Sequence, residues 1–289
     1  MQKPLRLKLK KVGIILRPST PQLKEYFIRV KTAFEKYGSE VLLDSLSAGM
    51  IGLVGVPFEQ MCKESSLLVS IGGDGTLISL ARRSYRYNKP ILGIHVGRLG
   101  FLTDIPAEEI ESFIEKIYKK EFVIDQRMVI EARLERGKRI KKFYAFNDIV
   151  LSKNSFTTMI HLKAFVDTKL LNVYYGDGLI ISTPTGSTAY NLSAGGPIVY
   201  PLTESFIITP ICPHALTQRP LVLPAKFEIK LETEDDGVVI VVDGQEIENF
   251  AKTERLSITI APRPIRMIHR KERDFFDVLR EKLGFGGAR

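Results

Sequence analysis

The sequence predicts an α/β domain, then a β-rich domain, and finally a helix that returns to the first domain. Two changes of hydrophobic periodicity carry this prediction. Short apolar runs alternate with helical periods up to about residue 125, and a period of two follows from about residue 127. The helical period returns over Phe275–Leu283. We expect domains at residues 1–126 and 127–270, and a C-terminal helix within 271–289 that packs on the first domain.

The first domain alternates apolar runs of strand length with stretches of helical spacing. The expected strands are Val12–Leu16, Val41–Leu43, Leu67–Ile71 and Ile91–Val96, and the expected helices cover Leu23–Tyr37, Thr76–Tyr85 and Ile110–Ile117. Thr20 and Pro21 fit the start of the first helix, and Gly38 fits its end. Strands that alternate with helices form right-handed βαβ units, so we expect a Rossmann-like parallel sheet.

In the second domain, apolar and polar residues alternate along several short runs. Examples are Ile130–Leu134, Ile160–Val166, Phe227–Leu231 and Leu256–Ile260. Arg136 and Gly137 supply a turn after the first run. Short alternating runs separated by turn signals are typical of antiparallel sheets, so we expect an antiparallel β-sandwich-like domain. The last helix has one apolar stripe and ends at Gly284.

The composition is that of a globular protein with an excess of positive charge. The 289 residues include 42 Lys and Arg against 33 Asp and Glu, which gives a net charge of +9. A basic protein suits an anionic partner such as a nucleic acid, a membrane surface or a phosphorylated small molecule. The sequence contains no basic groove-reading helix, no aromatic RNA-binding strand and no apolar run of about 18 residues. We therefore expect neither a nucleic-acid nor a membrane partner.

Cysteines and histidines are few and scattered. Cys62 and Cys212 form no C-x-x-C pair, so we expect neither a disulfide framework nor a thiolate zinc site. This cysteine usage is typical of a reducing, cytoplasmic compartment. The four histidines are His95, His161, His214 and His269. Their spacing matches no metal-binding motif, so we expect no metal site built by the protein alone.

A glycine-rich turn, Gly72–Thr76, follows the apolar run Leu67–Ile71 and precedes a helix. Ligands of open α/β sheets bind at the carboxyl ends of the strands. Glycines let the backbone approach a phosphate, and amides at a helix N-terminus can donate to it. Asp74 can accept a proton from a hydroxyl or help to hold a cation. Asp-Gly is also ordinary turn chemistry, and the chain has four such dipeptides.

A second unusual stretch, Ser182–Pro197, consists almost entirely of hydroxyl-bearing, small and glycine residues. Such residues are poor material for a core or a helix. They suit a loop that wraps a polar ligand, with Tyr190 available for stacking. The alternative is a Ser/Thr-rich surface loop.

Four parts of the sequence together resemble the NAD kinases, which phosphorylate the 2′-hydroxyl of the adenosine ribose in NAD. They are Gly72–Thr76, Asn147-Asp148, Asp177–Pro197 and Pro213–Leu221. The resemblance extends in order from Val12 to Gln245. It implies an enzyme that transfers the γ-phosphate of ATP to NAD, giving NADP and ADP.

The resemblance implies a role for each matching position. Asp74 matches the proposed general base, which takes the proton of the attacking ribose hydroxyl. Gly72, Gly73, Gly75 and Thr76 would lie against ATP phosphates or the NAD pyrophosphate. Asn147 and Asp148 would hold ribose hydroxyls. The other implied NAD-binding positions are Thr158, Tyr175, Asp177, Thr185, Thr188, Ala189, Tyr190, Asn191, Leu192, Ser193 and Gln245.

Two positions depart from the family pattern. Asp148 replaces the usual Glu, which shortens the reach of that contact and keeps its charge. Arg98 stands where relatives often have Asn, so it changes the local phosphate contacts. The resemblance also implies a homodimer or homotetramer. A divalent ion, Mg²⁺, is expected to arrive with ATP, since the chain has no metal-ligand cluster of its own.

Three other functions remain open at this point. A lipid or sugar kinase could share the G-G-D-G turn. A nucleic-acid-binding protein would explain the basic charge, and a non-catalytic NAD sensor would explain the loop. The retained Asp74 in its turn argues against the sensor.

Overall fold

The computed structural model describes residues 9–154 and 159–286, which belong to two compact units. Unit 1 comprises the chain up to Gln126 together with the chain from Ile265 onward, and unit 2 runs from Arg127 to Pro264. No helix in these described ranges is long and apolar enough to cross a membrane.

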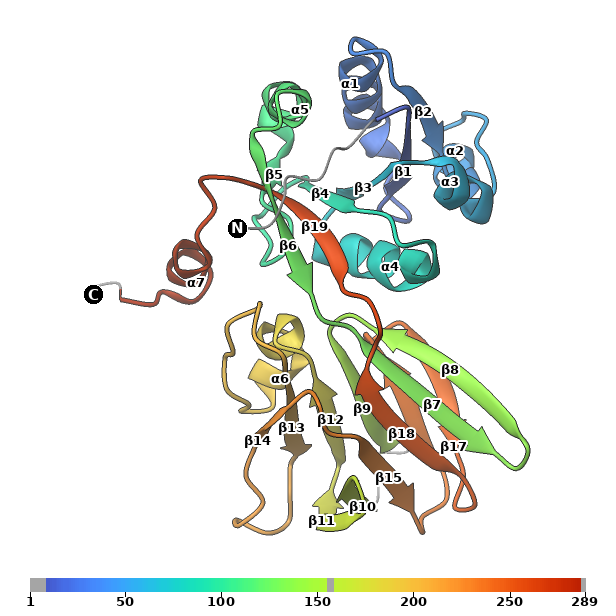
Figure 1. The fold of residues 1–289 in the computed structure, drawn as a ribbon, viewed down its shortest axis with the longest axis vertical. Coiled ribbons are helices and arrows are strands. Elements are labelled where there is room, and N and C mark those ends of the chain that lie inside the picture. Colours follow the sequence, from blue (N-terminus) through green and yellow to red (C-terminus); the bar gives the residue numbers. More distant parts are fainter. Residues whose placement is uncertain (1–8, 155–158, 287–289) are drawn as a thin grey trace. The chain divides into compact units, whose positions relative to one another are not determined.

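Unit 1 is built on a seven-stranded sheet (Figure 1). Its strands are β1 (Lys11–Leu16), β2 (Glu40–Leu43), β3 (Leu67–Gly72), β4 (Ile91–His95), β5 (Ile105–Pro106), β6 (Phe122–Arg127) and β19 (Ile265–Arg270). Their order is β2-β1-β3-β4-β19-β6, with β5 paired to β4. Strands β2, β1, β3, β4 and β19 run parallel, as the alternation of strands and helices predicts.

The helices of unit 1 bury the faces that their sequence spacing indicates. They are α1 (Lys24–Glu35), α2 (Ser45–Met50), α3 (Phe58–Glu64), α4 (Asp74–Ser84), α5 (Ile110–Tyr118) and α7 (Phe275–Leu283), with 3-10 turns η1 (Pro21–Leu23), η2 (Tyr85–Tyr87) and η3 (Ala107–Glu109). Phe27, Val30 and Phe34 of α1 are buried in one cluster with Val12, Ile14 and other strand residues. The apolar area removed from water along these faces is what holds the helices on the sheet.

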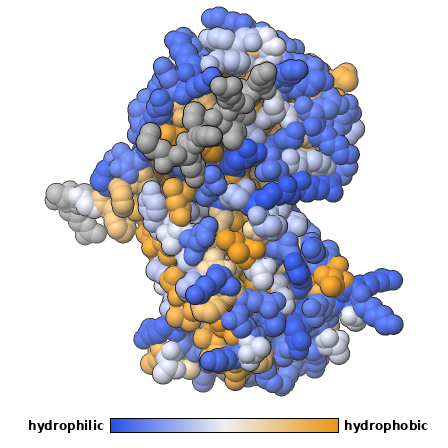
Figure 2. Space-filling view, viewed as in Figure 1, coloured by the Kyte–Doolittle hydropathy of each residue, from blue (hydrophilic) through white to orange (hydrophobic). Residues whose placement is uncertain are grey.

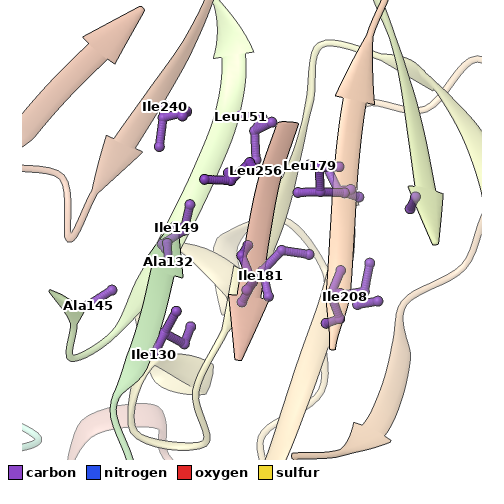
Figure 3. Close-up of a cluster of buried hydrophobic side chains, with 14 of the residues drawn as sticks. Ile130, Ala132, Ala145, Ile149, Leu151, Leu179, Ile181, Ile208, Ile240 and Leu256 are labelled. Carbon is purple, nitrogen blue, oxygen red and sulfur yellow. The ribbon is translucent and has the colours of Figure 1, made fainter. Parts of the chain in front are cut away.

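Unit 2 consists of two six-stranded antiparallel sheets. One has the order β11 (Lys169–Gly176), β10 (Ile160–Val166), β15 (Ile229–Thr233), β18 (Arg255–Ile260), β7 (Ile130–Arg136) and β8 (Arg139–Ala145). The other has the order β14 (Leu221–Pro224), β13 (Ser205–Ile211), β12 (Gly178–Ser182), β9 (Asp148–Lys153), β16 (Val238–Val242) and β17 (Glu246–Phe250). Buried side chains of both sheets form one core (Figure 3). The predicted fold class is confirmed.

Three local features differ from the expectations. Several strands of the second sheet carry no alternation, because β12 and β13 are buried throughout and β9 is buried over Asp148–Leu151. The Ser/Thr-rich stretch is not one long loop: it contains the short helical segments η4 (Thr185–Thr188) and α6 (Tyr190–Ser193). Finally, β19 returns to the sheet of unit 1, so the chain re-enters that unit at Ile265.

Candidate functional site

The glycine-rich turn lies at the carboxyl end of β3, in the interior of the parallel sheet of unit 1. Helix α4 begins directly at Asp74, two residues earlier than its spacing suggests. A Cβ built on Gly73 or Gly75 would meet no atom within 4 Å, so the backbone is open to a ligand at these two positions. A Cβ on Gly72 would lie 2.7 Å from Oγ1 of Thr76, so glycine is needed there for the turn to close. The turn therefore combines an exposed backbone with a helix N-terminus, as a phosphate site requires.

The Asp74 carboxylate is held by a segment that follows β4. Its Oδ2 accepts a hydrogen bond from the Phe101 amide at 2.6 Å. Its Oδ1 accepts from the amides of Leu102 and Thr103 at 3.2 and 3.0 Å and from the Thr103 hydroxyl at 2.9 Å. Four donors fix the orientation of a side chain that would otherwise rotate in solvent.

The same segment needs glycine next to the carboxylate. A Cβ built on Gly100 would overlap the Asp74 carboxylate and lie 2.6 Å from Oγ1 of Thr103. Arg98 is exposed in this segment, and the Val96 amide donates to the Gly72 carbonyl at 2.8 Å. The glycine-rich turn and the segment 96–103 therefore form one structural feature in unit 1.

A second cluster lies in unit 2 around the start of β9. Asp243 follows β16 in the three-residue hairpin loop 243–245, where both Asp243 and Gly244 have positive φ. The Asp243 carboxylate accepts from the amides of Phe146, Asn147 and Asp148 at 3.0, 2.7 and 3.1 Å. It thereby fixes the backbone that presents Asn147 and Asp148.

The two presented side chains are buried polar groups. Asn147 is 8% and Asp148 4% exposed. Within the described residues, Oδ1 of Asn147 and Oγ1 of Thr185 are buried without a hydrogen-bond partner. Burial, and then the nearby Asp243 charge, raise the pKa of Asp148 to about 7. Buried polar atoms are normally paired, so the Asn147 and Thr185 oxygens can each accept a further hydrogen bond.

Asn147, Asp148 and Asp243 line a pocket of about 360 Å³ within unit 2, whereas Thr185 does not. Its lining residues are Asn147, Asp148, Val150, Ser152, Ala189, Tyr190, Val241, Asp243 and Gly244. Apolar side chains and a half-exposed tyrosine stand beside two carboxylates and an amide, a composition that suits a nucleoside with its ring and hydroxyls.

The other predicted positions in the Ser/Thr-rich stretch have mixed surroundings. The Asn191 side chain is fully buried: its amide donates to Ser187 and Pro197 carbonyls, and its carbonyl accepts from the Thr209 hydroxyl at 2.6 Å. Asn191 therefore holds the loop together. Thr188 and Leu192 are partly buried, and Ser193 is exposed.

The remaining predicted positions lie apart from this pocket's lining. Tyr175 is stacked on His161, with ring centroids 4.3 Å apart, and lies 5.4 Å from the His214 ring. The Asp177 amide donates to the Ile211 carbonyl, and Gln245 is exposed on the β16–β17 hairpin. Thr158 lies outside the described residues.

Sequence reasoning missed the structural role of Asp243. The available signal was its Asp-Gly dipeptide directly after the apolar run Val238–Val242, one of four such dipeptides in the chain. The dipeptide predicts a hairpin turn. It does not reveal which amides the carboxylate reaches.

We expect the stability of the protein to fall as the pH rises through the range in which Asp148 ionises. The folded chain keeps this proton up to pH about 7, whereas the unfolded chain releases it near 3.8. The folded state binds the extra proton between these values, so increasing pH lowers the free energy of unfolding, by at most about 4 kcal/mol in total.

Asp148→Asn cannot ionise and should remove this contribution. Thermal unfolding of both proteins between pH 5 and 8.5 checks the expectation, with the variant gaining stability over the parent as the pH rises. An unchanged difference across the series would contradict it.

No group of three or more His, Cys, Asp or Glu side chains in the described ranges could hold a metal ion. Mg²⁺ needs few protein ligands when it binds together with substrate phosphates, because it retains several waters.

Two family models match the parts of the chain that contain the glycine-rich turn and the pocket. A family model described as the ATP-NAD kinase N-terminal domain matches residues 12–122, and one described as the ATP-NAD kinase C-terminal domain matches residues 146–270. An NAD kinase of Wolinella succinogenes is 54% identical over 281 residues, covering 97% of each chain. An NAD kinase of Sulfurimonas denitrificans is 49% identical, covering 96% of this chain and 98% of its own.

Two solved structures are similar in fold. Yeast NADH kinase complexed with NADH has a TM-score of 0.89 and 27% identity, covering 100% of this chain and 90% of that one. An NAD kinase from Archaeoglobus fulgidus in complex with ATP has a TM-score of 0.77 and 25% identity, covering 95% of this chain and 98% of that one.

Proposed function

This chain belongs to the NAD kinase family, and we propose that it carries out ATP-dependent phosphorylation of NAD with Asp74 as the general base. The γ-phosphoryl group of ATP passes to the 2′-hydroxyl of the adenosine ribose, giving NADP and ADP. The observation that carries the assignment of the base is the Asp74 carboxylate, which four donors orient at the carboxyl end of β3. An oriented carboxylate is what proton abstraction from a bound hydroxyl requires.

In the proposed reaction, Asp74 accepts the 2′-hydroxyl proton as that oxygen bonds to the γ-phosphorus, and the bond to the ADP oxygen breaks. Phosphoryl transfer asks little covalent chemistry of a protein, so positioning and charge neutralisation dominate. The open backbone at Gly73 and Gly75, with Gly72 and Thr76 beside it, suits the phosphates. Mg²⁺ bound to ATP would neutralise charge on the transferred group.

For NAD we propose the pocket of unit 2. The buried Oδ1 of Asn147 and the carboxylate of Asp148 can accept hydrogen bonds from ribose hydroxyls. Tyr190, which is 47% exposed on the pocket rim, can stack on a ring of the dinucleotide. The further proposed NAD contacts are Thr158, Tyr175, Asp177, Thr185, Thr188, Ala189, Leu192, Ser193 and Gln245, while Asn191 contributes by holding its loop.

We also propose that the chain forms a homodimer or homotetramer and that it works in the cytoplasm. Leu202, Leu216 and Val222, in the edge strand β14 and in the loops that flank β13, are exposed apolar side chains. Apolar surface appears on this side of unit 2 in Figure 2. Exposed apolar surface suits an interface between copies. Both cysteines are free thiols, which suits a reducing compartment.

One assay tests the activity directly. The purified chain is incubated with ATP, Mg²⁺ and NAD, and NADP is detected with an NADP-specific dehydrogenase. NADH, diacylglycerol and fructose 6-phosphate are offered in parallel. We expect NADP from NAD. Phosphorylation of the lipid or the sugar with none of NAD would replace this function by that of a lipid or sugar kinase.

Tyr190→Ala should raise the KM for NAD by about 5- to 150-fold, since stacking on a base is worth about 1–3 kcal/mol. The KM for ATP should stay unchanged. Tyr200→Ala is the matched control, because Tyr200 is 48% exposed in the same unit and does not line the pocket. Steady-state kinetics, with each substrate varied separately, measure the two KM values. A change confined to the KM for ATP would exclude Tyr190 from the NAD site.

A further inference from the structure

The segment 99–103, which holds Asp74, also accepts hydrogen bonds from side chains of the C-terminal part of unit 1. The Arg273 guanidinium donates from Nη1 to the Leu102 carbonyl at 3.1 Å and from Nη2 to the Phe101 carbonyl. Lys282 donates to the Leu99 carbonyl at 2.6 Å. These carbonyls alternate with the amides that point at Asp74, so the segment lies between an acidic side chain and two basic ones.

The planarity of the peptide bond links the two sides rigidly. The Phe101 carbonyl and the Leu102 amide belong to one planar group, and the Leu102 carbonyl and the Thr103 amide belong to the next. Arg273 binds the oxygen end of both groups, and Oδ1 of Asp74 binds the N–H end of both. A rotation of either peptide plane must therefore break a bond at both ends.

Arg273 is in turn fixed in a buried polar cluster. Its side chain is 8% exposed, and Nη1 lies 3.4 Å from Oδ1 of Asp104 and 3.0 Å from Nδ1 of His269. Burial alone would raise the pKa of Asp104, but the adjacent His269 and Arg273 and the Arg270 amide outweigh it and hold that pKa below its usual value. Asp104 is thus a fixed negative charge that keeps the guanidinium in place.

We propose that Arg273 is a positioning residue for Asp74, acting through the peptide groups 101–102 and 102–103. The inference rests on the proposed function, in which Asp74 is the general base. A planar guanidinium is suited to this role because its rigid fork presents N–H donors to two successive carbonyls in a fixed geometry, whereas a lysine ammonium is a compact charge on a flexible stem. Arg273 touches neither substrate in this role: it keeps the amides aligned on the base.

The test replaces Arg273 by Met and by Lys in the full-length chain. We expect Arg273→Met to lower kcat by about tenfold to a hundredfold, because small misplacements of a catalytic group have effects of this size. The KM values for NAD and ATP should change little. Arg273→Lys should lower kcat less than Arg273→Met does. Because it keeps the positive charge beside Asp104, Arg273→Lys tests the proposal if Arg273→Met fails to fold.

Two readouts separate positioning from simple loss of folded protein. In an Asp74→Asn background, Arg273→Lys or Arg273→Met should lower kcat by less than about twofold, because the base through which Arg273 acts is already absent. Native-state hydrogen exchange of the Leu102 and Thr103 amides should quicken in the Arg273 variants, while amides of α1 stay unchanged.

Arg266→Met is the matched control. Arg266 lies in β19 and donates to the Asn88 carbonyl at 2.6 Å, so its loss removes a guanidinium–carbonyl bond of the same kind elsewhere in unit 1. We expect kcat close to that of the parent.

Equal loss of kcat in both backgrounds, or unchanged exchange at Leu102 and Thr103, overturns the positioning role. Failure of the proposed function has a different signature, namely an Asp74→Asn variant that keeps its turnover.

Discussion

Asp74→Asn should lower kcat for NAD phosphorylation by about 10²- to 10⁴-fold, the usual contribution of a general base. The asparagine side chain can still accept the three bonds that reach Oδ1 of Asp74, so the segment after β4 should stay in place. Its NH₂ group would face the Phe101 amide, which is left without an acceptor at a cost of about 1–3 kcal/mol. Turnover is therefore expected to collapse while thermal unfolding changes by only a few degrees.

The control for this variant is Asp236→Asn, the same chemical change in another of the four Asp-Gly dipeptides. Asp236 is exposed and pairs with Lys252 on the surface of unit 2. We expect full activity from it. An Asp74→Asn enzyme that retains more than half of the parent's kcat would exclude Asp74 as the base.

Asp243→Ala should destabilise unit 2 by about 3–5 kcal/mol and weaken NAD binding with it. Three backbone amides, those of Phe146, Asn147 and Asp148, lose their acceptor, and an unsatisfied buried donor costs about 1–3 kcal/mol. Loss of the Asp243 charge would ease the ionisation of Asp148, but burial is the larger cause of that raised pKa and remains. Urea unfolding and calorimetric titration with NAD measure the two effects.

Asp167→Ala is the matched control for this second variant. Asp167 also has a positive φ, and its carboxylate accepts one amide bond, from Glu228 at 3.1 Å. The control therefore reports the backbone strain of alanine together with the loss of one exposed bond, for which we expect about 1 kcal/mol. Equal destabilisation by both variants would mean that the three amides gain little from Asp243.

Asp74→Asn and Asp243→Ala test two features of the site that the sequence reveals to different degrees. The glycine-rich turn is visible in the sequence because its glycines and Asp74 stand side by side after an apolar strand. The apolar spacing of α1 and α5 likewise predicts which faces are buried, since hydrophobic periodicity follows from local geometry. The alternating strands of unit 2 are predicted for the same reason.

Other features depend on contacts between distant parts of the chain. The amides that hold Asp74 come 27 to 29 residues later, Asp243 reaches amides 95 to 97 residues earlier, and Arg273 binds the Leu102 carbonyl across 171 residues. None of these pairs leaves a periodic trace in the sequence. The return of β19 to unit 1 is of the same kind, because an apolar run does not say which sheet it joins.

Residues near one another in the chain thus predict the fold class, the order of most helices and strands, the position of the glycine-rich turn and the family resemblance. Each of these depends on residues close together in the chain or on motifs read in order. The contacts that depend on tertiary structure are the groups that orient Asp74, the carboxylate that holds the backbone of Asn147 and Asp148, and the arginine that binds the Phe101 and Leu102 carbonyls. A hydrogen-bond partner is chosen by distance in space, and the fold alone brings these groups within 3 Å or so of one another.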